Sequence, residues 1–197
     1  MNTEMVEPLL TRCRQVCSHR ALGLSELRAL QDSADLPASV LAELKQPDPA
    51  HPYGRKVLLA GEGVEVMVAT WTRGMPCVPH DHGGALGVVR VLQGRARHRV
   101  WKVEDGALEL RKEHVAVAGD LLSCGADFIH SMGDDGADEP LMTLHMYAPT
   151  IDFMVVYDET AGQTLVVDGD CGAWIPPRER VRTSHPGMLR RSQLGVA

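Results

Sequence analysis

An all-β domain with a short helical arm at its N-terminus is the fold class that this sequence of 197 residues predicts. Beyond about residue 53, short apolar runs alternate with turn signals rich in glycine and aspartate, a pattern typical of barrels and jelly rolls. Before residue 47, apolar residues recur at spacings of three and four, which is the period of one helix face. Strand periodicity alone does not choose among the β architectures, so that choice depends on the motifs that the strands carry.

The helical arm is expected to cover residues 1–46 as three helices. Ser25 is placed to cap the second helix, over residues 26–31, and Pro37 to start the third, over residues 38–45. We expect the arm to pack against the barrel and to cover a sheet edge. The apolar face of the first helix consists of Val6, Leu9, Leu10, Cys13, Val16 and Cys17.

The whole chain, residues 1–197, fits a single domain with one hydrophobic core. After a proline-rich linker, the β barrel is expected over residues 53–170, followed by a basic tail over residues 171–197. We interpret the tail as a surface-hugging or frayed terminus. The candidate strands are residues 55–59, 64–72, 86–93, 96–103, 108–117, 120–124, 128–132, 141–147 and 153–157.

Composition excludes several classes of function. The formal net charge of −6 and the pI of about 5.8 argue against an extended nucleic-acid surface. No apolar run approaches the roughly 20 residues that a membrane span needs. The start of the chain lacks the basic and apolar regions of a signal peptide, so we expect a cytoplasmic protein. The odd count of five cysteines, without a C-x-x-C pair, indicates free thiols and no structural zinc ribbon.

Two histidines separated by one residue, His80 and His82, are the strongest candidates for a metal site. Pro79 on one side and a Gly-Gly pair on the other disfavour a long helix here. On a strand, residues two apart point to the same face, so both imidazoles can reach one point. Neutral imidazole is the commonest metal ligand among side chains. The alternative is a coincidental pair, and a metal needs a third ligand, which His130 in a later strand-like run can supply.

The spacing of glycines around this histidine pair resembles the first motif of the cupin superfamily, and the second cupin motif would supply its histidine at His130. The match departs at Gly87, where cupins usually place a glutamate ligand. Three neutral imidazoles keep the full charge of the metal and leave coordination positions open, which suits an anionic guest such as a thiolate. The residues of the first motif are Gly74, His80, His82, Gly87 and Gly94.

Among the cupins, the chain resembles most closely the cysteine dioxygenase type I family, in its bacterial form that keeps an arginine and lacks the Cys-Tyr cross-link. The resemblance covers residues 53–158 and implies a cupin jelly-roll barrel with one Fe(II) bound by His80, His82 and His130. Iron follows from the resemblance only, because imidazole also suits zinc, nickel and copper. Besides the histidines, the matching segments are Tyr53-Gly54-Arg55, Val91-Leu92-Gln93-Gly94 and the run from Thr143 to Asp152.

The resemblance also implies a substrate-binding pair. Arg55, together with Tyr53, would hold the carboxylate of the substrate, and the planar guanidinium fork matches the two carboxylate oxygens. The alternative for Arg55 is an edge-strand arginine in solvent. Related mercaptopropionate dioxygenases carry glutamine at this position, so Arg55 favours a thiol amino acid, although thiol acids such as mercaptosuccinate stay open.

Three polar residues, Thr143, His145 and Tyr147, alternate along one predicted strand and therefore share a face. They are either a polar stripe satisfied by mutual hydrogen bonds or, by resemblance, a catalytic relay in which each residue orients the next. Gly87 replaces the cysteine to which animal enzymes cross-link this tyrosine, so Tyr147 is expected to be unmodified. The resemblance also predicts a cis peptide bond between Ala148 and Pro149.

The implied function is a thiol dioxygenase that converts L-cysteine and O2 to cysteine sulfinic acid, within cysteine catabolism and taurine biosynthesis. Its partners would be a small thiol amino acid and O2, with no nucleic acid or membrane, and the protein would be a monomer or a weak homo-oligomer. Two alternatives stay open: the same chemistry on 3-mercaptopropionate or mercaptosuccinate, and a cupin that binds metal or a small ligand without catalysis. Histidines without an identified partner are interpreted as mostly surface residues; they are His19, His51, His98, His114 and His185.

Overall fold

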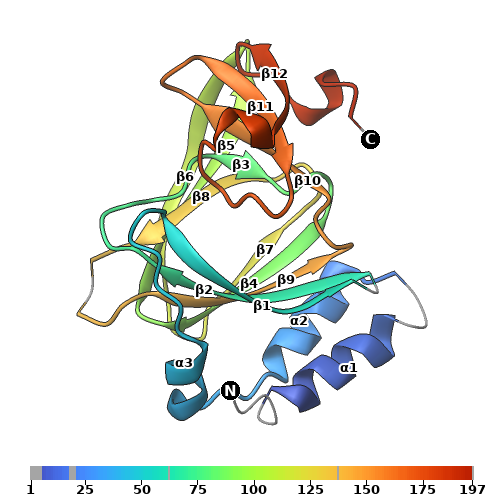
Figure 1. Ribbon diagram of the computed structural model, residues 1–197, viewed down its shortest axis with the longest axis vertical. Helices are drawn as coiled ribbons and strands as arrows, with labels where there is room; N and C mark the ends of the chain where they lie inside the picture. The colour runs from blue at the N-terminus through green and yellow to red at the C-terminus, as the bar shows by residue number, and fades with distance from the viewer. Residues whose placement is uncertain (1–5, 18–20, 62, 137, 197) are drawn as a thin grey trace.

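Two antiparallel sheets face each other and form a barrel, which confirms the predicted β fold (Figure 1). The computed structural model describes residues 6–17, 21–61, 63–136 and 138–196. The strands are β1 (Tyr53–Gly61), β2 (Val64–Trp71), β3 (His80–Asp81), β4 (Leu86–Gln93), β5 (Arg95–Glu104), β6 (Ala107–Val117), β7 (Leu121–Cys124), β8 (Ile129–Asp134), β9 (Met142–Ala148), β10 (Phe153–Asp158), β11 (Gln163–Asp168) and β12 (Val181–Pro186). One sheet has the order β1-β2-β9-β4-β7 and the other the order β12-β11-β10-β3-β8-β5-β6.

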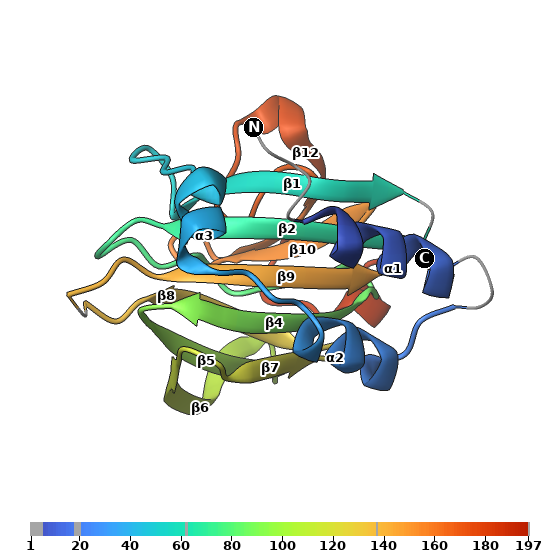
Figure 2. The ribbon, with the colours of Figure 1, turned by 90° about the horizontal axis from the view of Figure 1, so that it is seen from below.

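A helical arm precedes the barrel and consists of α1 (Glu7–Cys17), α2 (Leu24–Asp32) and α3 (Ala38–Leu44). Helices α1 and α2 lie against the outer face of the first sheet, with α1 against β2 and α2 against β4 and β9 (Figure 2). Leu27 and Leu30 of α2 pack in one apolar cluster with Val88 of the sheet. The arm therefore covers a sheet face, a larger role than the edge cover we expected. No helix within the described residues is long and apolar enough to cross a membrane.

Strands β2 and β9 are buried on both faces, which lets them carry polar side chains toward the inside of the barrel. Side chains alternate along a strand, and Leu144 and Met146 of β9 pack against the helical arm. Thr143, His145 and Tyr147 of the same strand therefore face the barrel interior. The helices thus supply an apolar core on the outer face, while the inner face is left for polar residues.

All nine predicted strands are present, with ends that differ from the prediction by at most two residues. The structure adds β3, β11 and β12 to them. Strand β3 has only two residues, His80 and Asp81, which are too few for strand periodicity to be visible in the sequence. Strand β12 is a mostly exposed edge strand without apolar alternation, and it pairs with β11. The tail of residues 171–197 therefore contributes a strand to the second sheet.

Helix α2 begins at a different cap from the one predicted. Gly23, and not Ser25, is the N-cap residue, and its backbone amide donates to the Glu26 carboxylate at 3.1 Å. Ser25 lies inside the helix, where its hydroxyl donates to the same carboxylate. Pro37 stands at the start of α3 as expected. Residues 1–5 of the predicted arm lie outside the described residues, as does His19.

One buried polar side chain fixes the helical arm to the sheet. Gln31 of α2 is fully buried, and its Nε2 donates to the carbonyls of Val88 and Leu144, each at 2.9 Å. Arg90 of β4 donates in turn to the carbonyls of Gln31 and Ala34 at the end of the helix. Because these bonds join α2 to two adjacent strands, they determine where the helix lies on the sheet.

We expect Gln31→Ala to lower the free energy of unfolding by about 1–3 kcal/mol, because it removes two buried hydrogen bonds and leaves a cavity. Urea unfolding followed by circular dichroism measures the change. Asp32→Ala, an exposed substitution on the same helix, is the matched control and should change stability by less than about 0.5 kcal/mol. A Gln31→Ala variant as stable as this control would contradict the anchoring role of the side chain.

Candidate metal centre

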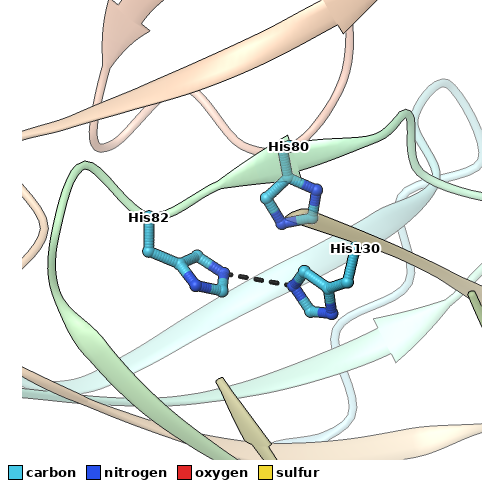
Figure 3. Close-up of side chains that lie close together, drawn as sticks. All are labelled: His80, His82 and His130. Carbon is cyan, nitrogen blue, oxygen red and sulfur yellow. Dashed lines mark hydrogen bonds between the residues drawn. The ribbon is translucent and has the colours of Figure 1, made fainter. Parts of the chain in front are cut away.

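Three histidines from two neighbouring strands meet inside the barrel (Figure 3). His80 lies on β3 directly opposite His130 on β8, and His82 follows the end of β3. All three are buried, and their ligand nitrogens lie within 4.8 Å of one another. Gly83 turns the chain after His82 with φ at +62°, and a Cβ there would lie 2.1 Å from the carbonyl oxygen of Phe153. Only glycine fits this turn, which places His82 beside the other two imidazoles.

Burial keeps the three imidazoles uncharged. Burial lowers the pKa of His80 to about 4, although a hydrogen bond to the Val78 carbonyl opposes the shift. Burial, and then the neighbouring imidazoles, lower the pKa of His82 and His130 well below the usual value. The cluster among the described residues contains no carboxylate. Neutral imidazoles are the form that binds metal, and this donor set fits a first-row divalent transition metal.

The Nδ1 atoms of the three candidate ligands differ in their contacts. Nδ1 of His80 lies 2.9 Å from the carbonyl oxygen of Val78, which fixes the proton on Nδ1 and leaves Nε2 as the ligand atom. Nδ1 of His130 lies 2.9 Å from Nε2 of His98, and the Nε2 atoms of His130 and His82 are 3.3 Å apart. Nδ1 of His82 has no hydrogen-bond partner among the described residues. The Nε2 atoms of His130 and His82 therefore face the centre of the cluster.

A chain of hydrogen bonds begins at Trp71 of β2 and continues along β9 from Thr143 to Tyr147. The indole N–H of Trp71 donates to the Thr143 hydroxyl at 2.8 Å, and this hydroxyl lies 2.7 Å from Nε2 of His145. Nδ1 of His145 lies 2.8 Å from the hydroxyl of Tyr147. Trp71 can only donate, so the Thr143 hydroxyl accepts from it. We assign this hydroxyl as the donor to Nε2 of His145, which places the proton of the neutral His145 ring on Nδ1. The Tyr147 hydroxyl then accepts from His145, and its own proton is free to donate elsewhere.

Tyr147 lies close to the histidine cluster. Its ring centroid is 4.6 Å from that of His82. A Cβ at Gly87 would lie 2.8 Å from Cε1 of this ring, so glycine leaves the space that the phenol occupies. Burial raises the pKa of Tyr147 well above its usual value, which keeps the phenol protonated. Cys124 lies opposite Gly87 on β7, and burial raises the pKa of its thiol to about 12.

A small cavity of about 20 Å³ lies between the cluster and the relay. Cys77 lines it as a neutral thiol, because burial raises its pKa to about 12, and its sulfur accepts from the Met132 amide. Cys77 is therefore a packed, uncharged part of the cavity wall. The remaining lining residues are Tyr53, Trp71, His80, His130, Met132, His145 and Tyr147.

Of the two predicted substrate-binding residues, Tyr53 lines this cavity and Arg55 does not. The Tyr53 hydroxyl accepts from the backbone amide of Ala173 at 2.9 Å. Arg55 lies two residues along β1, on the same face, but it does not line the cavity. Its guanidinium instead donates to the backbone carbonyls of Gly169 and Asp170. Arg55 therefore lies outside the lining of the cavity and contacts the segment that follows β11.

One smaller expectation is confirmed, and the side chain between His80 and His82 can be placed. The peptide bond between Ala148 and Pro149 is cis, as predicted. Asp81 points away from the histidines that flank it, and its carboxylate accepts from the Gly83 amide at 2.8 Å.

Sequence reasoning missed the buried state of His98, which we had interpreted as a surface residue. His98 is 2% exposed, and burial lowers its pKa to about 4. A signal was present in the sequence, because Ala96 and His98 alternate with the arginines at positions 95, 97 and 99 along a predicted strand. This alternation indicates that His98 shares the inner face with Ala96, whereas the arginines face outward.

The barrel and its buried histidine cluster define the class of protein: a cupin with a candidate three-histidine metal centre. The model of the family Cysteine dioxygenase type I matches residues 2–160, and the chain belongs to this family. A curated relative, Cysteine dioxygenase type 1 of Danio rerio, is 21% identical over 173 residues, covering 82% of this chain and 83% of the relative.

Solved structures of low identity align with parts of the chain. An oxalate oxidase aligns with a TM-score of 0.50 at 17% identity, covering 66% of this chain and 71% of its own. A Klebsiella pneumoniae protein with a double-stranded beta-helix domain gives a TM-score of 0.47 at 20% identity, covering 58% of this chain and 90% of its own. The predicted cupin fold is thus confirmed, and the family with its three-histidine cluster supports a thiol dioxygenase and suggests a bound metal.

The buried histidines make the stability of the metal-free protein depend on pH. His80 and His98 have pKa values of about 4 in the folded protein and about 6.5 without burial, so the unfolded chain binds more protons between these values. Stability should therefore fall as the pH falls from about 6.5 to about 4, and the effect should be absent above that window. Urea unfolding at stepped pH measures this dependence. A His80→Leu variant should show a shallower dependence, and an equal slope would contradict the assignment.

Proposed function

We propose that this protein is an Fe(II)-dependent thiol dioxygenase that oxidises L-cysteine to cysteine sulfinic acid with both atoms of O2. The observation that supports this most is the cluster of three buried, neutral imidazoles beside the hydroxyl-bearing ring of Tyr147. Three neutral ligands leave the charge of a divalent cation uncompensated, so the site favours an anionic guest such as a thiolate. Bound there, Fe(II) would supply the redox chemistry that activates O2, which zinc does not provide.

Tyr147 is proposed to orient the reacting guest. Its hydroxyl accepts from His145, so its own proton can donate into the cavity that Tyr147, His80 and His130 line. The phenol stays protonated because burial raises its pKa, and it therefore acts as a hydrogen-bond donor. Trp71 and Thr143 hold His145 in the tautomer that this role requires.

Arg55 and Tyr53 are proposed to hold the carboxylate of the substrate. Both project to the same face of β1, and Tyr53 lines the cavity. The Arg55 guanidinium is engaged with neutral carbonyls of residues 169 and 170, and a carboxylate is the stronger partner for it. A substrate carboxylate can therefore replace these carbonyls. An arginine at this position favours cysteine over 3-mercaptopropionate by resemblance to the family, and mercaptosuccinate remains the second candidate. A cytoplasmic location and a role in taurine biosynthesis are further parts of the proposal.

Oxygen uptake by the iron-loaded protein tests the function directly. We expect consumption of one O2 per thiol with L-cysteine, and formation of the sulfinic acid, which mass spectrometry identifies by the gain of two oxygen atoms. Zinc-loaded protein is the matched control and should consume no oxygen, because zinc does not change its oxidation state. Absence of oxygen uptake with L-cysteine, 3-mercaptopropionate and mercaptosuccinate, despite bound iron, would favour a metal-binding protein without this activity.

Replacing Arg55 tests the carboxylate contact. We expect Arg55→Ala to lower kcat/KM for the preferred thiol acid by roughly 10- to 100-fold, the equivalent of losing a hydrogen bond to a charged group. Steady-state oxygen uptake measures the change. Lys56→Ala is the matched control on the same strand, because the Lys56 side chain binds the Glu43 carbonyl of the helical arm instead of facing the barrel. Unchanged kcat/KM in Arg55→Ala would exclude the carboxylate role.

A further inference from the structure

We propose that His98 is a positioning residue for the metal centre, which holds the ring of His130 with its Nε2 toward the metal. The observation is the short contact of 2.9 Å between Nε2 of His98 and Nδ1 of His130, both of them buried. His98 lies on β5, two residues from Val100, which is the residue paired with His130 across β5 and β8. The contact therefore links two adjacent strands of the second sheet.

The direction of this hydrogen bond follows from the geometry of the cluster. Nε2 of His130 faces the other candidate ligands, 3.3 Å from Nε2 of His82. A metal needs the lone pair of that Nε2, so the proton of the neutral His130 ring must reside on Nδ1. Nδ1 then donates to Nε2 of His98, which accepts. This arrangement selects one tautomer and one ring orientation of His130, as the outer partners of metal-bound histidines do.

The His98 ring is itself held in place by its neighbours. His114 of β6 lies edge-on to it, with ring centroids 5.0 Å apart, and Phe128 lies nearly parallel at 6.1 Å. The sulfur of Cys124 is 4.0 Å from Nδ1 of His130, at the limit of a hydrogen bond to sulfur, and a thiol is a weak acceptor. His98 is therefore the stronger of the two polar contacts that reach Nδ1 of His130 within the part of the chain that the structure describes.

The choice of histidine has a chemical consequence. A carboxylate is a common outer partner of a metal-bound histidine, and it would add a negative charge next to the site. Neutral His98 satisfies the Nδ1–H of His130 without that charge. The cation would therefore keep its attraction for an anionic guest. The inference requires a metal at His80, His82 and His130, but it does not depend on which thiol is oxidised.

Cobalt binding by two His98 variants tests the proposal without turnover. His98→Leu fills a similar volume and removes the acceptor, whereas His98→Gln keeps an acceptor oxygen on a side chain of similar reach. We expect His98→Leu to weaken Co²⁺ binding about 10- to 100-fold and to change the visible absorption bands of the bound ion. His98→Gln should recover most of the affinity and the wild-type bands. Titration of the metal-free proteins with Co²⁺, followed by absorption, measures both quantities.

His114→Leu is the matched control, because it removes the ring packed against His98 and leaves the contact to His130 in place. Thermal melting of each metal-free variant identifies a temperature at which all are folded, and the titrations are compared there. Wild-type affinity and bands in His98→Leu, an equal loss in His98→Gln, or an equal loss in His114→Leu would each overturn the proposal. Failure of the wild-type protein to bind Co²⁺ would overturn the metal centre as well, whereas intact Co²⁺ binding without oxygen uptake by iron-loaded protein would overturn only the proposed function.

Discussion

The candidate site depends on the burial of three uncharged imidazoles, those of His80, His82 and His130, inside the barrel. An isolated charge in a protein interior is costly, so a buried histidine either stays neutral or obtains a partner. In this fold β3 lies between β8 and β10 and pairs with both strands. This pairing places His80 directly opposite His130, where both rings are buried and uncharged. A strand of two residues has little stability by itself, and here neighbouring strands fix it on both sides. The candidate site is therefore a product of the sheet and not of a local loop.

The helical arm explains how a barrel of this size can have a polar interior. Helices α1 and α2 bury the outer face of the first sheet, where β2 and β9 present valine, leucine and methionine. Stability can come from that apolar layer, so the inner face of β9 can carry Thr143, His145 and Tyr147. Each of these polar groups has a hydrogen-bond partner, which is the condition for burying them. The apolar outer face and the polar inner face of the same strands thus link the arm to the chemistry inside the barrel.

The sequence predicted the site where local geometry was sufficient. His80 and His82 share a face because strands alternate, and the same rule placed Thr143, His145 and Tyr147 together. Contacts between distant strands were harder to predict. His98 contacts His130, which lies 32 residues further along the sequence, and the local sequence around either residue does not predict this contact. The strand β12 escaped prediction because an exposed edge strand needs no apolar alternation, and the contacts of Arg55 with residues 169 and 170 depend on how the tail folds back.

Under the proposed role of Arg55, its contacts with residues 169 and 170 compete with the guest carboxylate for the same guanidinium. A guest that takes this guanidinium must detach residues 169 and 170, and the same segment anchors the Ala173 amide on Tyr53. Guest occupancy and detachment of the segment are then linked equilibria, and the energy of the internal contacts is subtracted from the measured affinity. Trp174 stacks on His51 at 4.3 Å between ring centroids, so its emission would change when the segment moves. Intrinsic fluorescence would therefore report guest binding in the absence of oxygen.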